Sequence, residues 1–151
     1  MASTVTASTL SVSLNETITL NGVQYGNNIT KTFETQGEVD QRIMEIESGE
    51  EASFTTIFSF STKDGKGQGV TDDYAYFRIT NLDDTNFVNL RITSGDSYWI
   101  KLKAGESFIL MDNEMEAKSV STSFSAFADI TSISAKADTA NVDIEYVIVT
   151  A

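Results

Sequence analysis

Residues that act as strong nucleophiles or as bases near neutral pH are scarce in this chain. It contains no histidine and no cysteine, which excludes Ser–His and Cys–His nucleophile pairs and also histidine or thiolate metal sites. Carboxylates do occur in adjacent pairs. Neighbouring residues of a strand point to opposite faces, and turns favour aspartate for backbone reasons. We therefore expect no facing carboxylate pair of the glycosidase type, and no enzymatic activity; the pairs are Glu50-Glu51, Asp72-Asp73 and Asp83-Asp84.

The glycine-rich polar segment of residues 62–74 is the one candidate for binding a cation or a phosphate. Asp64, Asp72 and Asp73 offer carboxylate oxygens of the kind that calcium prefers. Their spacing is not that of an EF-hand loop, two lysines inside the segment oppose a cation, and the glycines form no phosphate-binding motif. We interpret the segment as a hairpin loop available to a partner, and we expect neither a metal nor a cofactor.

Aromatic and basic side chains suggest a binding surface instead. In residues 74–80 and 97–103, polar and apolar residues alternate, so one side of each expected strand faces a core. The inward set is Phe77, Ile79, Tyr98, Ile100 and Leu102, and the outward set is Tyr74, Tyr76, Arg78 and Trp99. Tyrosine, tryptophan and arginine are enriched at binding hot spots, so the outward set is our candidate partner interface. The alternatives are a layer that covers both faces, or a bulge that reverses the parity.

The same period of two runs through nearly the whole chain and predicts half-buried β-strands. Turn or bend signals stand at Asn15-Glu16 and Asn21-Gly22. Residues 39–47 fit either a helix or a strand, and we favour a strand because the segment is too short for a self-supporting helix. Further strands are expected at residues 29–35 and 128–136, the latter as the partner of the last strand. The clearest apolar stripes are Leu10, Val12, Leu14, Ile18 and Leu20; Phe54, Phe58 and Phe60; Val88, Leu90 and Ile92; and Val142, Ile144, Tyr146 and Ile148.

Strands of this length, separated by turn residues every 8–12 positions or so, predict an all-β fold. We expect about 8–10 strands in an antiparallel β-sandwich of jelly-roll type. No linker or shift in composition interrupts the chain, so residues 1–151 are expected to form a single domain, with residues 1–9 as a candidate N-terminal arm. The chain has no proline, so its edge strands are protected by other means or pair with a partner.

The charge and the hydropathy of the chain restrict its partners. The net charge is -12, and the ten basic residues are scattered, which argues against nucleic acid. No apolar run approaches the ~20 residues of a membrane span. The first residues lack the features of a signal peptide, so we expect synthesis in a reducing cytosol. Acidic residues concentrate in residues 34–51, as a solvated face or as a docking surface for a basic partner.

Three motifs resemble small virion structural proteins of tailed bacteriophages. They are YFRITNLDDTNFVNLRI, YWIKLKAGESFIL and ISAKADTANVDIEYVIV. The resemblance covers residues 54–150. It comprises a hairpin around ITNLDDTN, a hairpin around KLKAGESF, and a closing strand that AKADTANV precedes. The AKADTANV segment contains an Asp-Thr hairpin turn. It implies a β-sandwich or jelly roll that decorates a capsid or builds tail and fibre attachments. No catalytic motif accompanies it.

The resemblance implies a capsid decoration or cement protein without enzymatic activity. Its partner would be the major capsid protein or another virion protein, and the chain would act as a homo-oligomer. It would be made in the host bacterial cytoplasm and reside in the virion. The alternative is a tail, fibre or receptor-binding piece, or a carbohydrate-binding module. In that case Trp99, Tyr74 and Tyr76 would stack against sugar rings.

Overall fold

The computed structural model describes residues 8–35, 39–49, 54–60, 74–112, 114–115 and 127–150. These residues form strands and no helix, which confirms the all-β prediction. No helix able to cross a membrane occurs among them. The strands are β1 (Ser8–Asn15), β2 (Ile18–Leu20), β3 (Val23–Tyr25), β4 (Asn28–Thr35), β5 (Val39–Ile46), β6 (Thr55–Ser59), β7 (Tyr74–Asn81), β8 (Val88–Ser94), β9 (Asp96–Leu102), β10 (Ser107–Leu110), β11 (Glu114–Met115), β12 (Ala128–Asp129), β13 (Ser132–Ala137) and β14 (Val142–Thr150).

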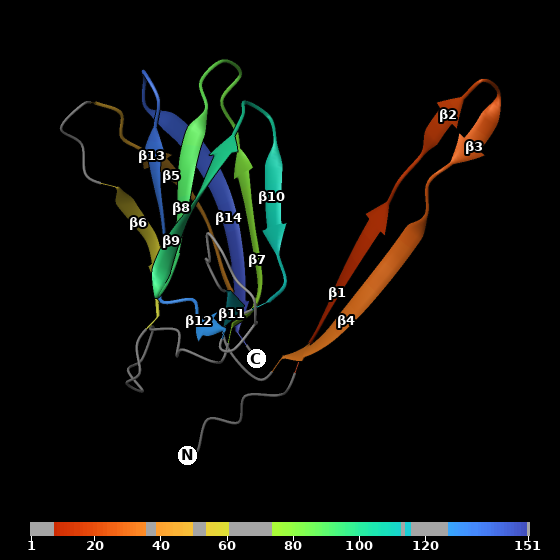
Figure 1. The fold of residues 1–151 in the computed structure, drawn as a ribbon, viewed down its shortest axis with the longest axis horizontal. Helices are drawn as coiled ribbons and strands as arrows, with labels where there is room; N and C mark the ends of the chain where they lie inside the picture. The colour runs from red at the N-terminus through yellow and green to blue at the C-terminus, as the bar shows by residue number, and fades with distance from the viewer. Residues whose placement is uncertain are drawn as a thin grey trace, which may run out of the picture.

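Two four-stranded sheets form the body of the molecule, and they pack face to face as the predicted β-sandwich (Figure 1). One sheet has the order β10-β7-β14-β5 and the other the order β6-β13-β8-β9. Every pairing inside these sheets is antiparallel. The body thus has eight strands, within the expected range. The remaining strands form two-stranded ribbons. The ribbons β1-β4 and β2-β3 project from the body, whereas β11-β12 lies against it, with Met115 packed on the core (Figure 1).

The order of the strands is that of a jelly roll. The pairs β5·β14, β6·β13, β7·β10 and β8·β9 are nested, like one long hairpin whose centre is the turn at Gly95. Between successive strands of the body the chain changes sheet, except at the β8–β9 turn. Rolling a long hairpin into two sheets produces the double Greek key of this architecture. The jelly-roll prediction is therefore confirmed by the topology.

Three connections that the sequence predicts as hairpins cross from one sheet to the other instead. Residues 82–87 join β7 to β8, residues 103–106 join β9 to β10, and residues 138–141 join β13 to β14. The expected pairing of residues 128–136 with the last strand is therefore wrong. Strand β13 pairs with β6 and β8, while β14 pairs with β5 and β7. Turn-forming residues reverse the chain in both cases, so they do not distinguish a hairpin from a crossing between layers about 10 Å apart.

The core between the sheets contains the side chains that the alternation placed inward. Phe77, Ile79, Val88, Leu90 and Ile92 are fully buried, and the inward residues of β14 are nearly so. Tyr98 and Ile100 are partly buried against this core. Residues 39–46 form a strand as predicted, with inward-facing residues Met44 and Ile46 against the core.

Strand β6 contains a bulge that the sequence does not reveal. Its pairing with β13 shifts between Ile133 and Ser134, so that Phe58 faces Ile133 and Thr56 faces Ser134. The shift reverses the parity of the strand. Phe58 and Phe60 consequently pack on the core, whereas Phe54, expected on the same side, lies against Trp99. The apolar stripe predicted for Phe54, Phe58 and Phe60 is thus divided between two faces.

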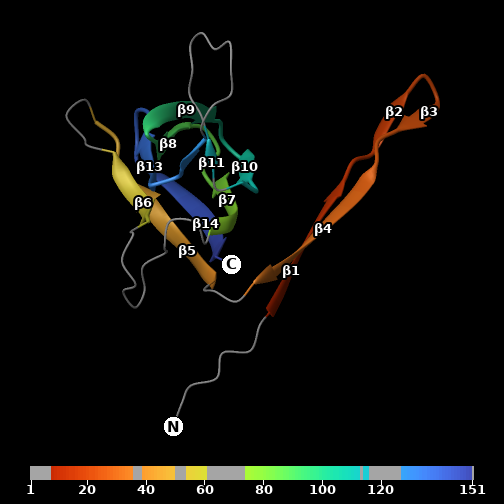
Figure 2. The same cartoon turned by 60° about the horizontal axis from the view of Figure 1, so that its bottom comes forward.

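Residues 8–35 form a hairpin that projects from the sandwich (Figures 1 and 2). Strand β1 pairs with β4, and β2 pairs with β3 around the predicted turn at Asn21-Gly22, where both residues have positive φ angles. The strands are where alternation placed them, but the expected burial on a core is wrong. Alternation shows that one side of a strand favours apolar cover, and it does not show what supplies that cover. Six apolar side chains are half exposed: Leu14, Ile18, Leu20, Val23, Tyr25 and Ile29.

The candidate arm of residues 1–9 lies mainly outside the described residues. Ser8 and Thr9 belong to β1, where they pair with Thr35 and Glu34. The segment that stands apart from the sandwich in the described structure is therefore longer than the sequence suggested, and it is a β-hairpin.

Candidate functional site

The outer face of the sheet β6-β13-β8-β9 brings together aromatic and polar side chains from distant parts of the chain. The antiparallel register aligns Ser134, Arg91 and Trp99 in one row across β13, β8 and β9. In the next row, Asn89 stands between Lys136 and Lys101. Because the flanking residues of these strands point into the core, the side chains of both rows share the outer face.

Trp99 is the centre of an aromatic cluster on this face. Its indole is 60% exposed, and it meets the ring of Phe54 edge to face at a centroid distance of 4.8 Å. The guanidinium of Arg91 lies 4.4 Å from the centroid of the Phe54 ring and 5.9 Å from that of Trp99. Arg91 Nε also donates a hydrogen bond of 3.1 Å to Ser134 Oγ. These contacts fix the two rings relative to the sheet.

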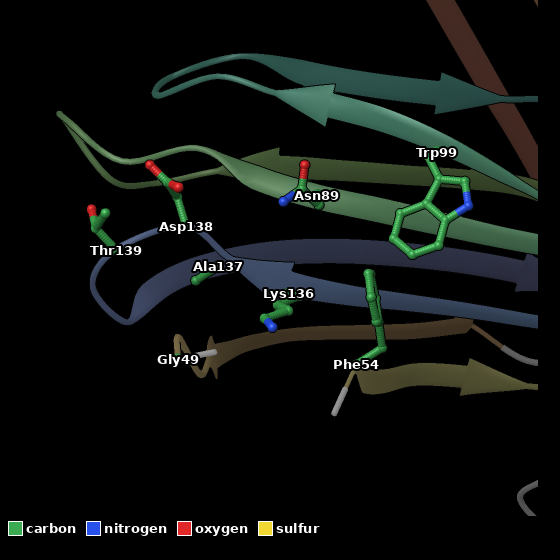
Figure 3. Close-up of a pocket in the computed structure, with 8 residues that line it drawn as sticks. All are labelled: Gly49, Phe54, Asn89, Trp99, Lys136, Ala137, Asp138 and Thr139. Atoms are coloured by element: carbon green, nitrogen blue, oxygen red, sulfur yellow. The ribbon is translucent and has the colours of Figure 1, made fainter. Parts of the chain in front are cut away.

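An open cleft of about 600 Å³ adjoins this cluster (Figure 3). Trp99 and Phe54 stand at one end, and Asp138 and Thr139 at the other. The polar side chains of Asn89 and Lys136 lie between them. A volume of this size is typical of sites for small molecules. The lining residues are Gly49, Phe54, Asn89, Trp99, Lys136, Ala137, Asp138 and Thr139.

The polar end of the cleft is held by bonds between two crossover loops. The backbone N–H of Asp138 donates to the carbonyl of Phe87 at 3.1 Å, and Thr139 Oγ1 donates to Asn86 Oδ1 at 2.9 Å. Asp83 in turn accepts hydrogen bonds from the backbone N–H groups of Asn86 and Thr85. Those bonds, that of Asn86 above all, lower the pKa of Asp83. In the pair Asp83-Asp84, Asp83 therefore serves the turn, as its position in the sequence suggested.

Charge on this face has the opposite sign to that of the whole chain. At the paired outward positions of the four strands, the charged side chains are Arg91, Lys101 and Lys136, and none is acidic. The net charge of the chain is -12. The acidic residue of the cleft, Asp138, follows the end of β13. The uncharged residues at these positions are Thr56, Ser59, Asn89, Thr93, Ser97, Trp99, Ser132 and Ser134.

The four residues of the candidate interface do not meet on one surface. Tyr76 and Arg78 lie on β7 and Trp99 on β9, in different sheets whose outer faces point to opposite sides of the sandwich. Tyr76 is 6% exposed, so it offers little contact area. The side chain of Tyr74 is outside the described part of the structure.

Arg78 is part of a polar network on its own sheet. Its Nη2 donates to Glu145 Oε2 at 2.9 Å, and its Nη1 donates to Thr80 Oγ1 at 2.7 Å. Glu145 also accepts a bond of 2.8 Å from Gln41 Nε2. The bonds from Gln41 and Arg78 lower the pKa of Glu145. A guanidinium already paired in this way contributes less to a partner than a free one.

Sequence reasoning missed most of the cleft. Asn89 and Arg91 have the outward parity of β8, so alternation alone could have added them to Trp99. Phe54 was hidden by the bulge. Among the described residues, no group of three or more potential metal-ligating side chains is present. Residues 61–73, which include Asp64, Asp72 and Asp73, lie outside the described ranges.

Comparison with protein-family models, with curated proteins and with solved structures finds no match. The fold and the cleft themselves define the chain as a jelly-roll β-sandwich with a projecting hairpin and one basic, aromatic face.

Proposed function

We propose that this chain is a structural protein of a tailed-phage virion, without enzymatic activity, that binds and stabilises the capsid lattice as a decoration or cement protein. The observation that carries the proposal is the projecting hairpin. Six of its apolar side chains are 50–59% exposed, from Leu14 at 50% to Leu20 at 59%. Two-stranded hairpins are marginally stable in water, and contiguous exposed apolar residues mark interaction surfaces. The hairpin therefore gains stability when another surface covers it.

The charge of the hairpin favours a second copy of this chain as one of its partners. Residues 8–35 contain Glu16, Glu34 and Lys31, a net charge of -1 out of -12 for the whole chain. Two acidic bodies repel each other, but a nearly neutral arm can approach a neighbouring copy with little electrostatic cost. In the described structure β1 and β4 pair only with each other, so each has an edge open to strand addition.

Architecture and sequence support the same proposal. Jelly rolls occur in viral capsid proteins, and the motifs within residues 54–150 resemble virion proteins of tailed phages. A fold by itself does not define a function, so the hairpin carries the proposal. A protein that binds the assembled lattice and not its free subunits stabilises the lattice by mass action.

Co-sedimentation with assembled capsids that lack this protein tests the proposal. We expect the full chain to sediment with the capsids and to raise their melting temperature. The double variant Ile18→Thr/Leu20→Thr keeps residues that favour strands but removes apolar area from the hairpin, so its binding should fall. Ile43→Thr, which removes a similarly exposed residue from the body, is the matched control and should bind normally.

Failure of the full chain to bind capsids would overturn the decoration or cement role. Loss of binding in the control as well as in the hairpin variant would assign the contact to another surface. Counting this chain in purified virions then separates the alternatives, because a shell protein is present in many copies and a neck, tail or fibre protein in few. Sedimentation of the free protein reports whether the same hairpin variant also disrupts a homo-oligomer.

A further inference from the structure

The cleft beside Trp99 belongs to the sandwich body and is separate from the hairpin on which the proposed function rests. We propose that it binds an acidic saccharide, that is, a sugar chain bearing carboxylates. In this arrangement the indole of Trp99 stacks against a sugar ring, and the ammonium of Lys136 pairs with a carboxylate. The proposal does not depend on the capsid.

The aromatic end of the cleft is preorganised for a flat, partly apolar ligand. Trp99 lies on the edge strand β9 and Phe54 directly precedes the opposite edge strand β6, yet their ring centroids are only 4.8 Å apart. Arg91 lies over the Phe54 ring from a central strand. The indole is thus held in place before a ligand arrives, while more than half of its surface is open. A pyranose ring offers an apolar C–H face that suits such a surface. Because the indole is already held in place, little side-chain entropy is lost when a ligand binds.

The middle of the cleft supplies hydrogen bonds of both kinds. The amide of Asn89 can donate and accept, and Lys136, its neighbour across the strands, has three donors. Thr139 and Asp138 add a hydroxyl and an acceptor at the far end. Sugar hydroxyls both donate and accept, so a cleft that offers donors and acceptors beside an indole matches a short saccharide. Apolar ligands would leave these groups without partners.

The positive charge on this face favours a saccharide that carries carboxylates. Lys101 is engaged with the ring of Phe87, at 3.8 Å from its centroid, and Arg91 with the aromatic pair. Lys136 lines the cleft and forms no ion pair among the described residues. A basic face on a strongly acidic chain attracts a short anion. The overall charge opposes a long polyphosphate, which argues against nucleic acid as the occupant.

The single tryptophan of the chain makes a direct test possible, since its emission reports on this cleft alone. The probes are tetramers of galacturonate and of mannuronate, the same tetramers with methyl-esterified carboxylates, and a short oligothymidylate. The variants are Lys136→Ala and, as a control of equal charge change, Lys31→Ala on the hairpin, where the lysine lies over Phe33. Calorimetry with Trp99→Phe checks the role of the indole.

We expect at least one acidic tetramer to change the emission of Trp99 saturably, with a Kd below about 1 mM. Its methyl ester should bind the wild type about tenfold more weakly or worse, and Lys136→Ala should weaken binding of the acidic tetramer to a similar extent. Lys31→Ala should bind as the wild type does. The proposal is overturned by the absence of saturation with both acidic tetramers, by equal affinity for the methyl esters, by tighter binding of oligothymidylate, or by equal losses in the two lysine variants. None of these results bears on the capsid-binding assay.

Discussion

The indole of Trp99 and the ring of Phe54 meet with their planes at 83° to each other, although they come from opposite edges of the same sheet. Trp99 lies on the edge strand β9, and Phe54 directly precedes the edge strand β6. Between them are the central strands β8 and β13, with Arg91 and Ser134. Ser134 is only 1% exposed despite its outward position. The paired rings and Arg91 thus give part of the outer face a small second core.

A double-mutant cycle measures the coupling between these rings. Phe54→Leu and Trp99→Leu each remove one aromatic partner and keep an apolar side chain. Edge-to-face pairs contribute about 0.5–1.5 kcal/mol beyond the area that they bury, so the two losses of unfolding free energy should be non-additive by about that amount. Urea denaturation followed by far-ultraviolet circular dichroism supplies the four values. Strict additivity would show that the rings contribute only through burial.

Asn81 should be the most sensitive polar residue of the body. It is fully buried, its Nδ2 donates to the carbonyls of Asn86 at 2.9 Å and Leu102 at 3.2 Å, and its Oδ1 accepts from the N–H of Asp83 at 2.9 Å. Asn81→Ala removes these three bonds to backbone groups in a buried position and should reduce the unfolding free energy by about 2–4 kcal/mol. Thr139→Ala removes one exposed bond and should cost less than about 1 kcal/mol. Urea denaturation of both variants checks the ranking.

Two isoleucines of the same sheet test the core assignment. Ile79 is fully buried, whereas Ile43 is 67% exposed. Ile79→Ala should lower the unfolding free energy by about 2–5 kcal/mol, because it removes packed methyl groups and leaves a cavity. The same change at Ile43 should remain within about 0.5 kcal/mol. Equal effects in equilibrium denaturation would contradict the arrangement of the two sheets.

Removal of residues 1–35 should leave the sandwich folded. The hydrophobic core includes no residue of the hairpin. All four nested strand pairs lie within the body. We expect the melting temperature of the shortened chain to change by less than about 4 °C. Differential scanning calorimetry provides the measurement at low protein concentration, where association contributes least. A much larger fall would mean that the hairpin stabilises the body.

The folded state should lose stability at alkaline pH because of Tyr146. Burial, together with the 2.9 Å hydrogen bond that its hydroxyl donates to Asp40 Oδ2, raises its pKa from 10.0 to about 12. Between these values the folded state keeps a proton that the unfolded chain releases. The unfolding free energy contributed by this group is therefore present below pH 10 and falls as the pH rises toward about 12. Tyr146→Phe should show a shallower decline over that window in denaturation experiments, and parallel declines would contradict the assignment.

The sequence by itself determined the class of fold and most of the strands. Alternation places Phe77 and Ile79, or Val88 and Leu90, on one side because neighbouring side chains of a strand point to opposite faces, and this rule is local. The absence of histidine and cysteine likewise excludes Ser–His and Cys–His nucleophile pairs from the sequence alone. Even the turn at Asn21-Gly22 follows from the conformations that these two residues tolerate.

Only the tertiary structure decided which strands pair and what covers each apolar side. Turn residues around Asp83 and Thr139 reverse the chain but do not state whether it returns to the same sheet. The bulge in β6 arises in its pairing with β13, so the residues around Phe54 do not by themselves predict that Phe54 lies beside Trp99. The hairpin also shows that local sequence does not determine which surface covers an apolar side. Leu14 and Ile18 have the pattern of core residues, yet in the described part of the structure they are half exposed and do not belong to the core. Alternation within a strand shows which side favours apolar cover, but the surface that covers it lies elsewhere.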